Sequence, residues 1–193
     1  MFHSTSTFEK KIISGFENAT RPQSRQEWRK WLTNNHNKEK NVWCIVAKKD
    51  SKVPGVNYVD AVEEAICFGW IDSKALSCDG DGYYQYFARR KPGSPWTRLN
   101  KSRAEALIQK GMMTEAGYAS IEAAKASGGW YLFDDAEDGI LPDDLKLVFQ
   151  NNPGYETKFQ ELSPAKQKQL LMALALKKSE AARTKVIQAY LES

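Results

Sequence analysis

WIDSKALSCDGDGYYQYFARR, residues 70–90, is the stretch that decides the fold of this chain. Residues 70–77 and 83–90 have the composition of strands, and Asp79-Gly80-Asp81-Gly82 lies between them. Aspartate–glycine pairs supply the positive φ angles that tight hairpin turns need. We therefore expect an antiparallel hairpin whose second strand alternates its side chains, with Tyr83, Gln85 and Phe87 on one face and Tyr84, Tyr86 and Ala88 on the other.

Capping signals upstream of this hairpin predict two helices with a strand between them. Ser24-Arg25-Gln26-Glu27 has the form of a capping box and predicts a helix over residues 25–35. Val42 to Ala47 is apolar on both alternating faces, which favours a central strand that is covered on both sides. Asn57 can cap a helix over residues 58–68, which Gly69 then ends. The fold class is therefore α+β, with a small antiparallel sheet of about three or more strands packed against helices.

Helical patterns dominate after the hairpin, and one acidic stretch interrupts them. Residues 134–141 combine Asp134, Asp135, Glu137 and Asp138 with Gly139, which is typical of a solvated connector. Ser163-Pro164 has the order that opens a helix. We therefore predict an α+β core domain over 1–133, an acidic connector over 134–141 and a C-terminal helical region over 142–193.

Composition narrows the class of protein. The chain has no apolar run long enough for a transmembrane helix, so no membrane insertion is expected. Its first residues have neither the basic nor the apolar segment of a signal peptide, which predicts a cytoplasmic location. Cys44, Cys67 and Cys78 are widely spaced and odd in number, so we expect reduced thiols.

Signatures of catalysis are weak. His3 and His36 are the only histidines, and neither has a cysteine, aspartate or histidine at a ligand spacing. No phosphate-binding loop or dinucleotide fingerprint is present, because Gly80 and Gly82 precede a strand rather than a helix. We therefore expect no metal and no cofactor, and the chain leans away from an enzyme.

A candidate ligand site combines the aromatic and charged residues around the hairpin. Guanidinium groups beside aromatic faces bind planar anions, and a nearby carboxylate can orient them. The candidate residues are Trp70, Tyr86 and Trp96 as apolar walls, Arg89 and Arg90 as anion donors, and Asp72 as the orienting acid. The partner would be a small anionic ligand or a protein, and a purely structural cluster is the alternative.

At these same residues the chain resembles a known family. The resemblance is carried by residues 63–73, residues 86–97 with Asn100, and residues 111–117. A C-terminal part adds to it, from about Leu141 through Phe159 and Leu162-Ser163-Pro164 to Ala182-Arg183. They are similar to the YdeI/OmpD-associated (OmdA), or bacteriocin-protection, family, and the match spans nearly everything from Ser24 onward. The resemblance implies a link to tolerance of cationic antimicrobial peptides and to an outer-membrane porin, but it carries over no catalytic residues. Some members are predicted to be periplasmic, and we expect this chain to depart from them, because its first residues do not have the pattern of an export signal.

The resulting prediction is a non-enzymatic binding or stress-tolerance protein of the bacteriocin-protection type. Two alternatives stay open. Residues 89–110 form a basic block with Glu105 as its single acid, which favours binding of nucleic acid or another phosphate-rich partner beside the aromatic residues. A small-molecule enzyme would instead need a deep pocket lined by the candidate site residues.

Overall fold

The computed structural model describes Phe16, residues 19–78 and residues 80–191, so His3 and Asp79 lie outside the described residues. The chain forms two compact units. The first consists of the residues up to Lys91 together with Arg103–Glu122, and the second of Pro92–Ser102 together with the residues from Ala123 onward.

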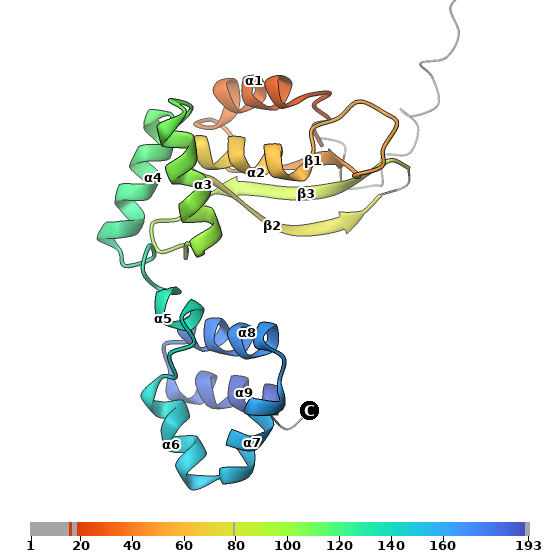
Figure 1. The fold of residues 1–193 in the computed structure, drawn as a ribbon. Helices are drawn as coiled ribbons and strands as arrows, with labels where there is room; N and C mark the ends of the chain where they lie inside the picture. The colour runs from red at the N-terminus through yellow and green to blue at the C-terminus, as the bar shows by residue number, and fades with distance from the viewer. Residues whose placement is uncertain (1–15, 17–18, 79, 192–193) are drawn as a thin grey trace, which may run out of the picture. The chain divides into compact units, whose positions relative to one another are not determined.

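The first unit contains a three-stranded antiparallel sheet (Figure 1). Its strands are β1 (Asn41–Ala47), β2 (Trp70–Ser77) and β3 (Gly82–Arg89), in the order β1-β3-β2. The predicted hairpin is confirmed, because β2 and β3 pair from Trp70↔Arg89 to Ser77↔Tyr83 and Gly80 has a φ of 98°. The expectation of a small antiparallel sheet within an α+β fold is therefore correct.

The position predicted for β1 is wrong, because β3 and not β1 is the central strand. The backbone of Thr20 covers the free edge of β1: its amide donates to the Trp43 carbonyl at 2.9 Å, and its carbonyl accepts from the Ile45 amide at 2.8 Å. An edge strand is usually marked by charged residues or proline, which prevent another chain from pairing with it. Because Thr20 already covers the edge of β1, this strand does not need such residues, and its apolar sequence resembles that of a central strand.

Two helices cover one face of this sheet (Figure 1). They are α1 (Arg25–Asn35) and α2 (Tyr58–Cys67), and both begin as predicted, with the side chains of Ser24 and Asn57 accepting hydrogen bonds from amides of the first turn. The buried Trp28 ring lies 5.3 Å from Phe87 of β3. The indole nitrogen of Trp28 donates to the Ala61 carbonyl at 3.0 Å, which joins α1 to α2.

A buried carboxylate also joins the two helices. Glu64 of α2 is fully buried, and its two oxygens accept from Arg25 Nε and Arg29 Nη1, each at 2.6 Å. Arg25 also contacts Asp60 and Glu63, and Arg29 donates to the Met112 carbonyl at 2.8 Å. Burying a charge is costly unless it is both paired and hydrogen-bonded, and Glu64 meets both conditions.

The C-terminal end of α2 meets the start of α4 at very short range. Helix α4 (Glu115–Ala126) follows α3 (Arg98–Gln109), and each of them has residues in both units. Gly69 ends α2 with a φ of 71°, and a Cβ added there would lie 2.8 Å from the Ala116 carbonyl oxygen. A Cβ on Gly117 would overlap the carbonyl oxygen of Cys67. Backbone contact this close leaves room only for glycine at both positions.

The second unit is helical from residue 134 onward. Its helices are α5 (Asp134–Glu137), α6 (Asp143–Asn151), α7 (Pro153–Glu161), α8 (Pro164–Ala175) and α9 (Glu180–Leu191), which confirms the predicted C-terminal helical region. Their shared core is apolar and includes Leu145, Phe149, Phe159, Leu170, Leu174, Ile187 and Leu191. Arg183 donates two hydrogen bonds to Asp144 and one to the Leu174 carbonyl, so a single side chain of α9 ties together α6 and α8.

The stretch predicted as a solvated connector, residues 134–141, includes the ordered helix α5 within the second unit. Three of its acids have cationic partners. Glu137 is largely buried and pairs with Lys168 at 2.8 Å, Asp138 pairs with Arg98 at 2.6 Å, and Asp134 pairs with Lys101. The stretch is therefore helical and ion-paired in part, while Asp135 is exposed, and its role as a connector stays a prediction.

Among the residues that the structure describes, no helix has both the length and the apolarity needed to cross a membrane. No disulfide joins Cys44, Cys67 or Cys78 in the structure.

Replacing Glu64 with glutamine tests the buried ion pairs. The variant keeps the size of the side chain but removes the carboxylate that Arg29 contacts and leaves Arg25 with Asp60 and Glu63. We expect the free energy of unfolding to fall by about 3 kcal/mol in urea denaturation. Glu63→Gln is the matched control and should cost less than about 1 kcal/mol, since Glu63 contacts only Arg25 and is more exposed. Equal losses for the two variants would contradict this role of Glu64.

Replacing Gly117 with alanine tests the close approach of α4 to α2. Alanine normally stabilises a helix relative to glycine, but here its Cβ would overlap the Cys67 carbonyl. We expect a loss of about 2 kcal/mol in stability, measured by thermal unfolding. Gly154→Ala in α7 is the control, because nothing lies within 4 Å of its added Cβ, and it should not destabilise. A stabilised Gly117→Ala variant would mean that the two backbones do not touch.

Candidate functional site

The structure places two of the predicted site residues in or near the core of the first unit. Trp70 is fully buried, its indole donates to the His36 carbonyl at 3.3 Å, and its ring packs edge to face on Trp31 at 5.9 Å. Arg90 is mostly buried, and its amide donates to the Gly69 carbonyl at 2.9 Å. Burial lowers the pKa of Arg90 to about 10, while the negative charge of Asp72 acts in the opposite direction.

The other four candidates have different surroundings. Arg89 is exposed and donates to the Glu39 carbonyl at 2.6 Å. Asp72 points toward α2, whereas Tyr86 lies on the opposite face of the sheet beside Trp43. Trp96 belongs to the second unit, where its buried ring lies 5.0 Å from Trp130. The structure therefore brings Asp72 and Arg90 within electrostatic range, and the grouping of all six residues in one site stays a prediction.

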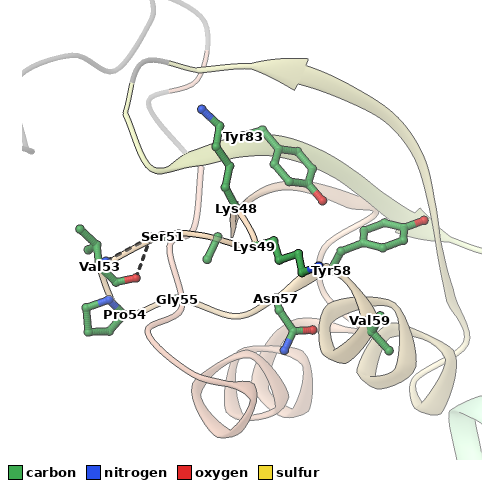
Figure 2. A pocket seen from close by; sticks show the side chains of 11 residues that line it. Lys48, Lys49, Ser51, Val53, Pro54, Gly55, Asn57, Tyr58, Val59 and Tyr83 are labelled. Atoms are coloured by element: carbon green, nitrogen blue, oxygen red, sulfur yellow. Dashed lines mark hydrogen bonds between the residues drawn. The ribbon is translucent and has the colours of Figure 1, made fainter.

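A hollow of about 680 Å³ opens elsewhere on the first unit, and we call it the β1–α2 pocket. Its wall consists of the end of β1, the loop over residues 48–55, the first turn of α2 and Tyr83 of β3 (Figure 2). Its volume is within the range of pockets that hold small organic molecules. The sequence of the loop indicates only turn material, so sequence reasoning misses this pocket.

Backbone contacts hold the loop of the β1–α2 pocket in place. The Ala47 amide donates to the Val56 carbonyl at 2.9 Å, and the Val56 amide donates to the Pro22 carbonyl at 3.1 Å. Gly55 passes so close to β1 that a Cβ on it would lie 3.0 Å from the Ala47 Cβ. Within the loop, the Ser51 hydroxyl bridges the amide and the carbonyl of Val53. The pocket wall is therefore formed before any ligand binds.

Two polar groups point into the space of the pocket. Figure 2 shows the Lys49 side chain running toward Tyr58 and the Tyr83 hydroxyl turned to the same side. The amino group of Lys48 points away and donates to the Gly80 carbonyl at 2.8 Å. The Asn57 side chain bonds both the amide and the carboxylate of Asp60. Lys49 and Tyr83 are thus the groups placed to contact a ligand.

The tyrosines of the pocket are neutral at physiological pH. Burial raises the pKa of Tyr58 to about 12, helped by the hydrogen bond that its hydroxyl donates to Asp72 at 2.8 Å. Burial also raises the pKa of Tyr83, with the charge of Asp72 adding to the effect. Gln85 is buried and donates to the same Asp72 oxygen at 3.4 Å. Asp72 therefore fixes the orientation of Tyr58, and the lysines supply the charge of the pocket.

The pocket combines cationic, hydroxyl-bearing and apolar side chains. Its described lining residues include no histidine, cysteine, aspartate or glutamate. The described part of the chain also holds no cluster of three or more histidine, cysteine or acidic side chains that could bind a metal ion. A lysine and a phenol beside apolar walls can bind an anion through charge-assisted hydrogen bonds.

Comparisons with known proteins match two regions of the chain. Residues 20–120 match the family described as Domain of unknown function (DUF8412). Residues 138–193 match the family described as Bacteriocin-protection, YdeI or OmpD-Associated, which confirms the resemblance at the C-terminal helices. The hairpin motifs assigned to the second family from sequence fall within the first match instead. No curated protein and no solved structure matches the chain.

Replacing Asp72 with asparagine should lower the pKa of Tyr58. A raised pKa favours the protonated phenol in the folded state, so the stabilisation it contributes is full below about pH 10 and is lost as pH rises toward 12. The variant removes the charged acceptor but keeps the burial, so the pKa should fall part of the way from 12 toward 10. The measurement is an NMR titration of ¹³C-labelled tyrosine, with the Tyr58 signal assigned by Tyr58→Phe. An unchanged Tyr58 titration would contradict the contact.

Proposed function

We propose that this chain, which belongs to the family described as Domain of unknown function (DUF8412), is a non-enzymatic binding protein that holds a small organic anion in the β1–α2 pocket. A protective role of the bacteriocin-protection type would then follow from binding this ligand. The C-terminal match supports that role at a coarse level.

The observation that carries the proposal is the single sign of charge in the pocket. Lys48 and Lys49 are its only ionised lining side chains among the described residues, and the Lys49 side chain runs toward Tyr58 (Figure 2). The Tyr83 hydroxyl can donate a second hydrogen bond to the same anion, because its raised pKa keeps it protonated. The lysine and the phenol would thus each donate a hydrogen bond to the anion, from two different directions.

Apolar walls set the other part of the ligand's chemistry. Val53, Pro54, Val59 and the ring of Tyr58 line the pocket beside the lysines. A bare inorganic ion would leave these surfaces in contact with water, whereas an aromatic or aliphatic body would cover them. The ligand class is therefore a carboxylate, sulfonate or phosphate attached to a small apolar group.

The charge of the pocket also limits how protection could work. Antimicrobial peptides of the cationic class would be repelled by Lys48 and Lys49, so the pocket is a poor trap for them. Protection would instead depend on the bound anion, with the protein acting as its carrier or sensor. The cytoplasmic location expected from the sequence stays a prediction.

Replacing Lys49 with alanine should weaken anion binding without unfolding the protein. We suggest benzoate as the probe, followed by chemical-shift changes in ¹⁵N NMR spectra. Losing one charge-assisted contact should raise the dissociation constant about tenfold or more. In the wild type, the shifted signals should include Lys49, Tyr58 and Tyr83.

Two controls make this experiment decisive. Lys52→Ala removes a neighbouring lysine that does not line the pocket, and benzoate binding should not change. Benzylammonium has a similar ring but a positive charge, and it should not bind. Equal affinity for the two probes would contradict the proposal, and so would chemical-shift changes on adding benzoate at residues outside the pocket.

A further inference from the structure

We propose that the face of the sheet turned away from α1 and α2 binds single-stranded nucleic acid. We call it the outer face, and it is centred on Trp43, Lys74 and Tyr86. The proposal concerns a different surface from the β1–α2 pocket and does not depend on a ligand there.

Strand alternation places an aromatic pair on the outer face. Val42 and Phe87 form one cross-strand pair beneath the helices, and the next pair along, Trp43↔Tyr86, must point the other way. The two rings lie 5.0 Å apart at 67°, and both are half-buried, with the Phe16 ring packed edge-on against Trp43 at 4.9 Å. Aromatic side chains in this state are the platform on which unpaired bases stack.

A β-bulge turns a lysine onto the same pair. Asp72 pairs with Phe87 and Ala75 pairs with Gln85, so Ser73 and Lys74 together stand opposite Tyr86 alone. Without the extra residue, Lys74 would pair with Gln85 and point toward the helices. With it, the Lys74 amino group lies 5.3 Å from both the Trp43 and the Tyr86 ring centres. Bulges commonly re-aim a side chain in this way at functional positions.

The end of the sheet next to this pair is also positive. The Arg89 amide donates to the Lys40 carbonyl at 3.1 Å, which brings the end of β3 to the start of β1. The side chains of Lys38, Lys40, Arg89 and Lys91 are all exposed there, and Glu39 is the one acid among the described residues 38–41 and 88–91. Asp72, the acid that could have interrupted the positive surface, lies on the helix-covered face bound to Tyr58.

Together these features favour a single strand over other partners. A phosphate backbone needs several cations along a path, and unpaired bases need accessible rings, which Trp43 and Tyr86 supply as one cross-strand pair on the outer face. Duplex DNA offers the phosphates but keeps its bases stacked on one another. A small anion would satisfy Lys74 and leave the aromatic pair unused.

The test is fluorescence anisotropy of the full chain with a fluorescein-labelled oligothymidylate of about twelve nucleotides, at a series of salt concentrations. Wild-type protein should bind, and the logarithm of the binding constant should fall with the logarithm of salt by about 0.7 for each phosphate neutralised. Tyr86→Leu and Lys74→Ala should each weaken binding about tenfold. Lys74→Ala should also make the salt dependence shallower.

Control variants show whether the strand binds at the outer face or elsewhere on the protein. Tyr86→Phe keeps the ring and Lys49→Ala alters only the β1–α2 pocket, so both should bind the oligonucleotide like the wild type. Thermal unfolding shows which variants are folded, and Lys74→Glu serves as a second surface change if Tyr86→Leu is not. No binding at low salt, equal binding of a matched duplex, or folded variants with unchanged affinity would overturn the proposal.

Discussion

The carboxylate of Glu64, buried between the guanidinium groups of Arg25 and Arg29, is the interaction on which the first unit depends. It holds α1 against α2, and a hydrogen bond from the Trp28 indole to the Ala61 carbonyl stabilises the same helix contact. A buried charge of this kind is stable only when both helices are in place, so it specifies their arrangement as well as stabilising it. With α1 and α2 fixed, one face of the sheet is covered by these helices, and the half-buried rings of Trp43 and Tyr86 lie on the other face.

Both proposed binding surfaces follow from the placement of α2. Its first turn carries Tyr58, which forms part of the β1–α2 pocket and is held by Asp72 of β2. Its last turn leads into Gly69, where the chain contacts α4 so closely that a side chain does not fit. The helix thus has little freedom to shift along the sheet. The fixed position of α2 can therefore keep both the β1–α2 pocket and the outer face of the sheet rigid.

The sequence predicts the fold of the first unit well, because its signals are local. The capping residues Ser24 and Asn57, the stop at Gly69 and the glycine-rich hairpin each depend on a few neighbouring residues, and all are predicted correctly.

The order of the strands is not predicted correctly, since it depends on the backbone of Thr20 covering the edge of β1. The ion pairs of the acids in 134–138 could not be predicted for a similar reason, because Arg98, Lys101 and Lys168 reach three of these acids from distant positions. The β1–α2 pocket is missed because Lys49 and Tyr83 are far apart in the sequence and meet only after β1 and β3 have paired.

Binding of a small organic anion in the β1–α2 pocket is tested most directly by anomalous diffraction. Crystals soaked in 4-bromobenzoate should show a bromine peak inside the pocket, with the carboxylate next to the Lys49 amino group and the Tyr83 hydroxyl. The ring should lie against Val53, Pro54 and Val59. An empty pocket in crystals where bromine peaks appear at other cationic surfaces would contradict the proposed function.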